Sequence, residues 1–166
     1  MLRVSKLTDY ATVVMTVLAE VTGSGRSDLA GLDSRGPERC AGVLSAQDLA
    51  VRAHLELPTV SKLLKQLAQA ELVVSFRGVN GGYRLARAPE QISLADVLVA
   101  MEGPFGMTEC SAHAGACGHE PHCGVRSNWR RVNEVIEATL RNVTLADMHR
   151  PPPPKRATIP LRLATH

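Results

Sequence analysis

Three cysteines lie close together in the second half of the chain, and thiolates are the side chains that bind zinc and iron most readily. Six residues separate Cys110 from Cys117, and five separate Cys117 from Cys123. Structural zinc sites usually pair cysteines about two to four residues apart. Wider loops suit an iron–sulfur cluster, whose ligands spread around an inorganic core. The spacing therefore favours a cluster and leaves a zinc site or three unliganded thiols as alternatives.

A cluster held by three cysteines needs at least one further ligand of another type. The loop and its edge contain five side chains with suitable chemistry: His113, His119, His122, Glu109 and Glu120. The remaining cysteine, Cys40, lies far away in a glycine-rich segment, and we expect it to play no part in the site. The N-terminal residues lack the continuous apolar core of a signal peptide. Cysteines of unsecreted chains are more often metal ligands or redox sensors than disulfides.

A second group of residues has the pattern of a DNA-reading helix. Residues 57–72 carry an apolar stripe at helical spacing, formed by Val60, Leu63, Leu64, Leu67 and Leu72. Thr59, Ser61 and Lys62 lie off that stripe in the first turn. The first residues of a recognition helix contact base edges in the major groove of double-stranded DNA. A short helix from Ser45 to about His54 precedes it, and the pair is typical of a helix-turn-helix.

A β-hairpin is expected directly after this helix. Residues 72–76 are β-branched and aromatic, and residues 83–85 form the returning strand, while the Asn80-Gly81-Gly82 sequence between them is typical of a tight turn. Arg77 at the tip could enter a narrow minor groove, and the glycines let the backbone approach a phosphate. We therefore expect Arg77, Asn80 and Gly81 to contact DNA. The alternative is a small helical domain with an ordinary hairpin that does not bind DNA.

Further helices are expected on either side of this unit, over residues 6–21 and 94–101. A long helix is expected over residues 125–142, with an apolar face formed by Trp129, Val132, Ile136, Leu140 and Val143. One small domain would bury only part of that face, and DNA half-sites are usually bound by dimers. We therefore expect a homodimer through this helix. The predicted fold is mainly α with a small β-hairpin, a winged helix-turn-helix plus a long C-terminal dimerisation helix.

Composition indicates a globular protein. The chain has 166 residues and a formal net charge of +3, and aromatic residues make up only 3%, so the core must be aliphatic. We expect a winged helix-turn-helix DNA-binding domain at residues 1–90 with a mobile loop at 22–42, a cluster-binding loop and dimerisation helices at 91–148, and a disordered tail at 149–166. No apolar run approaches the ~20 residues of a membrane span. A cytoplasmic protein without a membrane partner is therefore expected.

Three motifs together resemble the Rrf2 family of bacterial winged-helix transcriptional regulators, over roughly residues 1–148. They are LTDYA at residues 7–11, RGVNGGY at residues 77–83, and the three-cysteine loop before a long helix. Residues 126–148 look most like the members that control the SUF iron–sulfur assembly operon. The resemblance implies a homodimer that binds an iron–sulfur cluster through Cys110, Cys117 and Cys123. The cluster is usually 2Fe–2S in this family, and 4Fe–4S in some nitric-oxide-sensing members.

The fourth ligand differs between branches of this family. In IscR-like members it is a histidine three residues after the last cysteine, but Arg126 occupies that position here. In NsrR-like members it is an aspartate in the first helix of the other subunit, and Asp9 occupies the matching position. The resemblance therefore implies Asp9 as the fourth ligand, with the loop histidines next. Thr59, Ser61 and Lys62 fall where the family reads bases, but their identities differ, so the operator can differ too.

The resulting prediction is a cluster-dependent DNA-binding regulator that represses SUF-type assembly genes and is not an enzyme. The first alternative keeps DNA binding but replaces the cluster with structural zinc, or makes the cysteines a thiol redox or nitric-oxide sensor. A more remote alternative is an iron–sulfur electron-transfer protein. The sequence shows no nucleotide-binding glycine motif, nucleophile–base arrangement or paired carboxylates that would support an enzyme.

Overall fold

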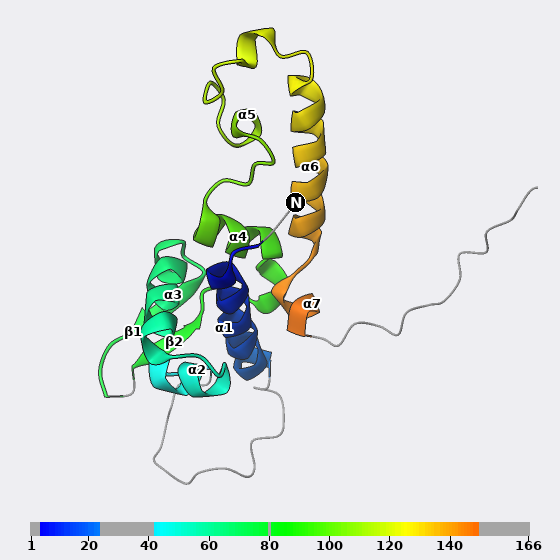
Figure 1. Ribbon diagram of the computed structural model, residues 1–166. Coiled ribbons are helices and arrows are strands. Elements are labelled where there is room, and N and C mark those ends of the chain that lie inside the picture. Colours follow the sequence, from blue (N-terminus) through cyan, green and yellow to red (C-terminus); the bar gives the residue numbers. More distant parts are fainter. Residues whose placement is uncertain (1–3, 24–41, 80, 150–166) are drawn as a thin grey trace, which may run out of the picture.

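The computed structural model describes residues 4–23, 42–79 and 81–149. Within these ranges the helices are α1 (Lys6–Gly23), α2 (Ala46–Arg52), α3 (Leu57–Gln69), α4 (Leu94–Glu102), α5 (Glu109–Ala112), α6 (Arg126–Asn142) and α7 (Leu145–His149). The strands are β1 (Val73–Phe76) and β2 (Gly82–Leu85), and two short 3-10 turns are η1 (Pro89–Gln91) and η2 (Glu120–His122). The predicted class, mainly α with one small hairpin, is confirmed (Figure 1).

Two helices begin at capping boxes that can be recognised in the sequence. The Ser45 side chain accepts a hydrogen bond from the backbone N–H of Asp48 at 3.1 Å, and the Ser93 side chain accepts one from Asp96 at the same distance. Each aspartate in turn accepts from the backbone N–H of its serine. Such reciprocal bonds satisfy N–H groups that a helix start leaves without intrahelical partners. The caps fix where α2 and α4 begin.

The hairpin is extended by a residue that the sequence does not mark as a strand. Strands β1 and β2 pair antiparallel from Val73 opposite Leu85 to Phe76 opposite Gly82. On the other edge of β2, Leu44 and Tyr83 exchange two backbone hydrogen bonds of 2.9 and 2.7 Å. A Cβ on Gly82 would lie 2.5 Å from the Leu44 carbonyl oxygen, so this close approach requires glycine. The wing is thereby tied to the segment that leads into α2.

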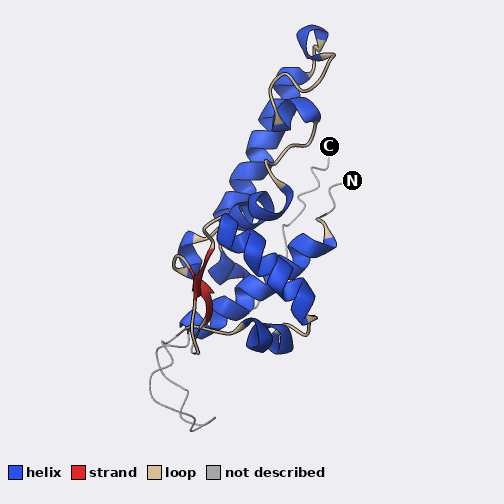
Figure 2. Cartoon of the chain, turned by 90° about the vertical axis from the view of Figure 1, so that its left-hand side faces the viewer, coloured by secondary structure: helices blue, strands red, loops and turns tan. Residues whose placement is uncertain are grey.

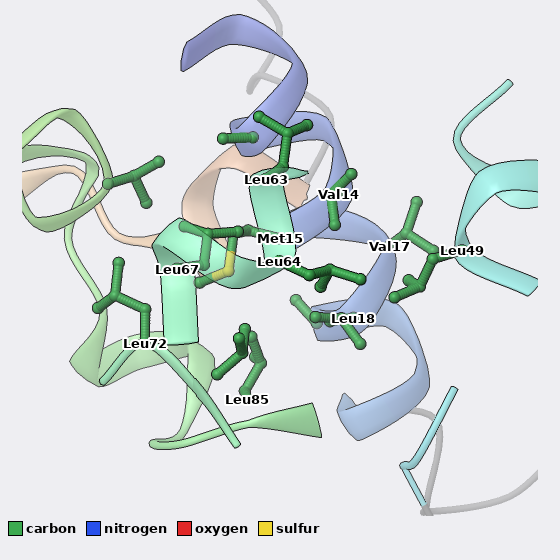
Figure 3. Packing of buried hydrophobic residues seen from close by; sticks show 14 of the residues in the cluster. Val14, Met15, Val17, Leu18, Leu49, Leu63, Leu64, Leu67, Leu72 and Leu85 are labelled. Carbon is green, nitrogen blue, oxygen red and sulfur yellow. The ribbon is translucent and has the colours of Figure 1, made fainter. Parts of the chain in front are cut away.

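The hydrophobic core is built around α1, which packs against α3, α4 and α7. Val14, Met15 and Leu18 of α1 are buried against the leucines of α3 (Figure 3). Ile92, Val97 and Leu145 belong to the same core, although they follow the predicted boundary at residue 90. Residues on both sides of position 90 therefore share one core. We keep the boundary only as a proposed division of function, with DNA binding before it and cluster binding and dimerisation after it.

Several element boundaries differ from the sequence prediction. Helix α3 ends at Gln69, and Leu72 lies just before β1 and outside the helix, because Glu71 adopts a φ of 57° that reverses the chain. Helix α1 continues to Gly23, two residues past the expected end, and the short helices α5 and α7 are additional. Cys40, Asn80, most of the predicted loop at 22–42 and nearly all of the predicted tail at 149–166 lie outside the described residues.

Helix α6 and the loop before it extend away from the core (Figures 1 and 2). Its boundaries match the predicted long helix within one residue. Asn133 is its only buried residue within the described part of the chain. The cysteine loop between α4 and α6 lies alongside this helix. The segments predicted to bind the cluster and to form the dimer therefore project from the core together.

Candidate functional site

The helix-turn-helix presents one face of α3 to solvent. Val60 and Leu63 are buried against the core, whereas Ser61 and Lys62 between them are exposed and Thr59 is half-buried. The turn between α2 and α3 contains His54 at a φ of 53°, a conformation that side chains other than glycine adopt rarely. The structure therefore brings the three predicted base-reading residues together at the start of a solvent-facing helix.

The wing carries an exposed tip beside α3. Arg77 is exposed, and Val79 next to it is fully exposed. The tip is closed by a hydrogen bond of 2.9 Å from the Gly81 N–H to the Gly78 carbonyl. A Cβ on Gly81 would lie 2.4 Å from the Phe76 carbonyl oxygen, so the turn requires glycine there for steric reasons. The guanidinium of Arg84 lies 5.0 Å from the Phe76 ring centre and braces the strands below.

The cysteine loop begins with a buried clamp on α6. The side-chain oxygen of Asn133 accepts a hydrogen bond from the Met107 N–H at 3.0 Å, and its amide nitrogen donates to the Phe105 carbonyl at 3.3 Å. Asn133 is 6% exposed. Sequence analysis missed this residue, although a polar side chain on the apolar face of an amphipathic helix was a signal. The clamp fixes the loop three residues before the first cysteine.

The three cysteines form no disulfide in this structure, and each is half-buried. The sulfur of Cys110 lies 3.3 Å from the Thr108 hydroxyl, within a hydrogen-bonded turn that begins α5. Cys117 and Cys123 lie on either side of η2. The histidines of the loop, His113, His119 and His122, are exposed.

A buried carboxylate organises the second half of the loop. Glu120 is 9% exposed, accepts a hydrogen bond of 2.6 Å from the Gly115 N–H, and forms an ion pair with Arg126 at the start of α6. The Nε of Arg126 is buried without a hydrogen-bond partner. Arg126 thus occupies the position of the histidine ligand in IscR-like members and holds the loop through Glu120. Both side chains are engaged with each other in this arrangement.

The three cysteines supply thiolates, which bind zinc ions as well as iron–sulfur clusters. In the described part of the chain, no three histidine, cysteine, aspartate or glutamate side chains gather as closely as a single metal ion requires. A zinc ion needs all of its ligands at about 2.0–2.3 Å from one centre, whereas a cluster spreads its thiolates over several irons. The three half-buried thiols lie on one 14-residue segment, Cys110 to Cys123, and within the described residues they are not gathered around one centre.

Asp9 is exposed in the first turn of α1, and the residue before it is bonded to the last residue of α4. Thr8 is fully buried and its hydroxyl donates to Oε1 of Glu102 at 2.6 Å, while the Ser5 N–H donates to the same oxygen at 2.9 Å. These hydrogen bonds hold the pKa of Glu102 below its ordinary value. Glu102 is the last residue of α4, directly before the loop. Sequence analysis missed this contact because Thr8 and Glu102 are 94 positions apart in the chain.

Part of the apolar face of α6 is left uncovered by the described residues. Trp129, Val132 and Val135 are 40%, 42% and 61% exposed. Ile136 and Leu140 continue the face and are half-buried. Exposed apolar stripes of this kind usually mark interaction surfaces.

Comparison with known proteins decides the family. Residues 38–151 match the profile of Rrf2, described as an iron-dependent transcriptional regulator. The chain belongs to the Rrf2 family. Protein rrf2 of Nitratidesulfovibrio vulgaris is 31% identical over 107 residues, which are 64% of this chain and 71% of that protein. This Rrf2-family chain is therefore a DNA-binding transcriptional regulator, and the expectation that it is not an enzyme is confirmed by what its relatives are.

Two solved structures show the same fold. IscR of T. potens is 30% identical with a TM-score of 0.58, covering 89% of this chain and 85% of that one. CymR, the global cysteine regulator of B. subtilis, is 26% identical with a TM-score of 0.60, covering 90% and 97%. The winged-helix architecture predicted for this Rrf2-family chain is confirmed by these likenesses. Within the described residues, every helix is too short or too polar to cross a bilayer.

Proposed function

We propose that this protein is a homodimeric repressor whose operator affinity depends on a 2Fe–2S cluster, and that it controls SUF-type iron–sulfur assembly genes in the cytoplasm. The observation that carries the proposal is the set of three free, half-buried thiols on the loop that joins α4 to α6. The family description as iron-dependent regulators and the likeness to IscR support it.

In this proposal Cys110, Cys117 and Cys123 hold the cluster and the partner subunit's Asp9 supplies the fourth ligand. Glu120 is paired with Arg126, whereas Asp9 and the loop histidines are all exposed, and the resemblance to NsrR-like members favours Asp9 among them. The bound cluster would supply an inorganic core that responds to oxidants and to iron supply. A carboxylate binds such iron less strongly than a thiolate. The Asp9 ligand is therefore expected to dissociate first.

DNA would be contacted by α3 and the wing. Thr59, Ser61 and Lys62 would face base edges in the major groove, and Arg77, with Asn80 and Gly81, would reach the adjacent minor groove. The exposure of the α3 and wing side chains among these residues supports this assignment. Dimers place two such units one helical turn of DNA apart. The exposed apolar face of α6 supports dimerisation through that helix.

Two alternatives make different demands on the same cysteines. A zinc-bound regulator would need the three thiols and one histidine to converge on a single ion. A thiol sensor without metal needs only accessible cysteines, and the three thiols are half-buried.

The experiment that tests the proposal is anaerobic purification followed by absorption spectroscopy and counting of iron and sulfide. We expect visible absorbance with iron and sulfide in equal amounts. Alanine at Cys110, Cys117 or Cys123 should abolish the absorbance, and Cys40→Ala, the matched control, should retain it. Colourless protein with stoichiometric zinc would overturn the proposal in favour of the first alternative. Colourless, metal-free protein that binds DNA only when its thiols are reduced would favour the second.

DNA binding is tested with duplexes selected from a randomised library by the parent protein, in its cluster-bound and cluster-free forms. We expect the two forms to differ in affinity for the selected duplex. Equal affinity would remove the cluster from the regulatory mechanism.

A further inference from the structure

Glu102 joins the base of the cysteine loop to the first turn of α1. Its Oε1 accepts hydrogen bonds from the Thr8 hydroxyl at 2.6 Å and from the Ser5 N–H at 2.9 Å. The Ser5 hydroxyl lies 2.9 Å from that of Thr8 and completes the group, which we call the Glu102 joint. Thr8 is fully buried, so its hydroxyl loses a hydrogen bond that it needs if the joint opens. Breaking the joint is therefore expected to cost free energy.

On one side, the joint leads directly to the proposed cluster. Gly103 follows at a φ of 87° and ends α4, and the Asn133 clamp then holds Phe105 and Met107 against α6. Cys110 comes three residues after Met107. Few residues lie between these fixed points, so the loop has little slack to absorb a displacement of Cys110. Movement of the loop is expected to act on Glu102.

On the other side, the joint leads to the DNA-reading surface. Helix α1 packs against α3 and β2, and the side chains between them are fully buried (Figure 3). Packed interiors transmit displacements because they have few voids to absorb them. Thr8 also precedes Asp9, the proposed ligand to the partner's cluster. The joint thus ties each subunit's own cysteine loop to the ligand that the subunit supplies.

We propose that Glu102 is a positioning residue that couples the state of the cysteine loop to the orientation of α1, and through α1 to the recognition helix α3. This inference rests on the proposed function, because it concerns how cluster binding changes operator affinity. Coupling between two sites is measured as the ratio of the affinities for one ligand in the presence and absence of the other. The joint should account for much of that ratio.

The test uses the full chain and two pairs of substitutions. Thr8→Val preserves shape and removes the donor, while Thr8→Ser keeps the hydroxyl. Thr12→Val is the matched control, since the Thr12 hydroxyl bonds the Thr8 carbonyl of its own helix. Glu102→Ala removes the acceptor, and Glu90→Gln is its control on an exposed turn. Operator affinity is measured for the cluster-bound and cluster-free forms of each variant, on the duplex selected by the parent protein.

We expect Thr8→Val and Glu102→Ala to bring the ratio of the two affinities at least about fivefold closer to one, the lower end of typical allosteric couplings. Thr8→Ser, Thr12→Val and Glu90→Gln should keep the parental ratio. In the cluster-free protein, the first two variants should also speed hydrogen exchange at the Gly103 amide, a readout that needs no cluster.

The outcomes separate the joint from the proposed function. A parental ratio in both Glu102→Ala and Thr8→Val, with cluster bound, would overturn the joint and leave the proposed function standing. Absence of a cluster, or equal affinities in the parent, would overturn the proposed function and the coupling together. If the buried Thr8→Val substitution prevents folding, Glu102→Ala at its exposed site decides the question alone.

Discussion

Replacing Asn133 by leucine should release the start of the cysteine loop from α6. Leucine has nearly the size of asparagine but neither donates to the Phe105 carbonyl nor accepts from the Met107 N–H. An unsatisfied buried polar group costs about 1–3 kcal/mol. The loop projects from the core, so the two freed backbone groups can hydrogen-bond to water. The cost for each group is therefore at the lower end of that range, which gives about 2 kcal/mol for the two groups together.

That free energy should appear as local opening of the loop. Because each 1.4 kcal/mol is a factor of ten, about 2 kcal/mol corresponds to exchange of the Met107 amide hydrogen about 30-fold faster in the cluster-free protein. Hydrogen exchange followed by mass spectrometry or NMR measures it. Asn128→Leu is the matched control, because Asn128 is exposed on the same helix. Unchanged Met107 exchange in Asn133→Leu would show that the clamp does not hold the loop.

Three further predictions concern DNA contact, dimerisation and pH. Arg77→Ala should weaken operator binding by about 1–3 kcal/mol and reduce its salt dependence, with dimer and cluster intact, and unchanged affinity at moderate salt would discard the wing contact. Val132→Asp should give monomers in sedimentation, because it places a charge on the exposed apolar face of α6. The control, Ala138→Asp on the opposite face, should remain a dimer. If both variants are dimers, the interface lies elsewhere. The pKa of Glu102 is held below 4.5 by its hydrogen bonds, so its stabilising contribution is present above that pH and is lost as the pH falls through the folded-state pKa. The difference in unfolding free energy between parent and Glu102→Gln should therefore shrink below about pH 4.5, and a difference independent of pH from 7 to 3 would contradict the assignment.

Local pattern determined most of the helices, because the information that fixes them is local. The Ser45–Asp48 and Ser93–Asp96 capping boxes and the apolar stripe of α3 lie within a few residues of the bonds and contacts that they form. The same holds for the three-cysteine segment, whose chemistry is a property of residue type and spacing. The end of α3 was predicted too late, because the apolar stripe continues to Leu72 while Glu71 adopts a positive φ that ends the helical path.

Only the tertiary structure decided how these elements are joined. The pairing of Leu44 with Tyr83, the clamp of Asn133 on Phe105 and Met107, and the bond from Thr8 to Glu102 each connect residues far apart in the chain. Such contacts depend on the packing of helices around α1, and no single-sequence pattern encodes the distance between two side chains. The sequence by itself therefore determined a winged-helix regulator with a cysteine loop, while the fold decided which polar residues hold the ends of α4 and of that loop against α1 and α6.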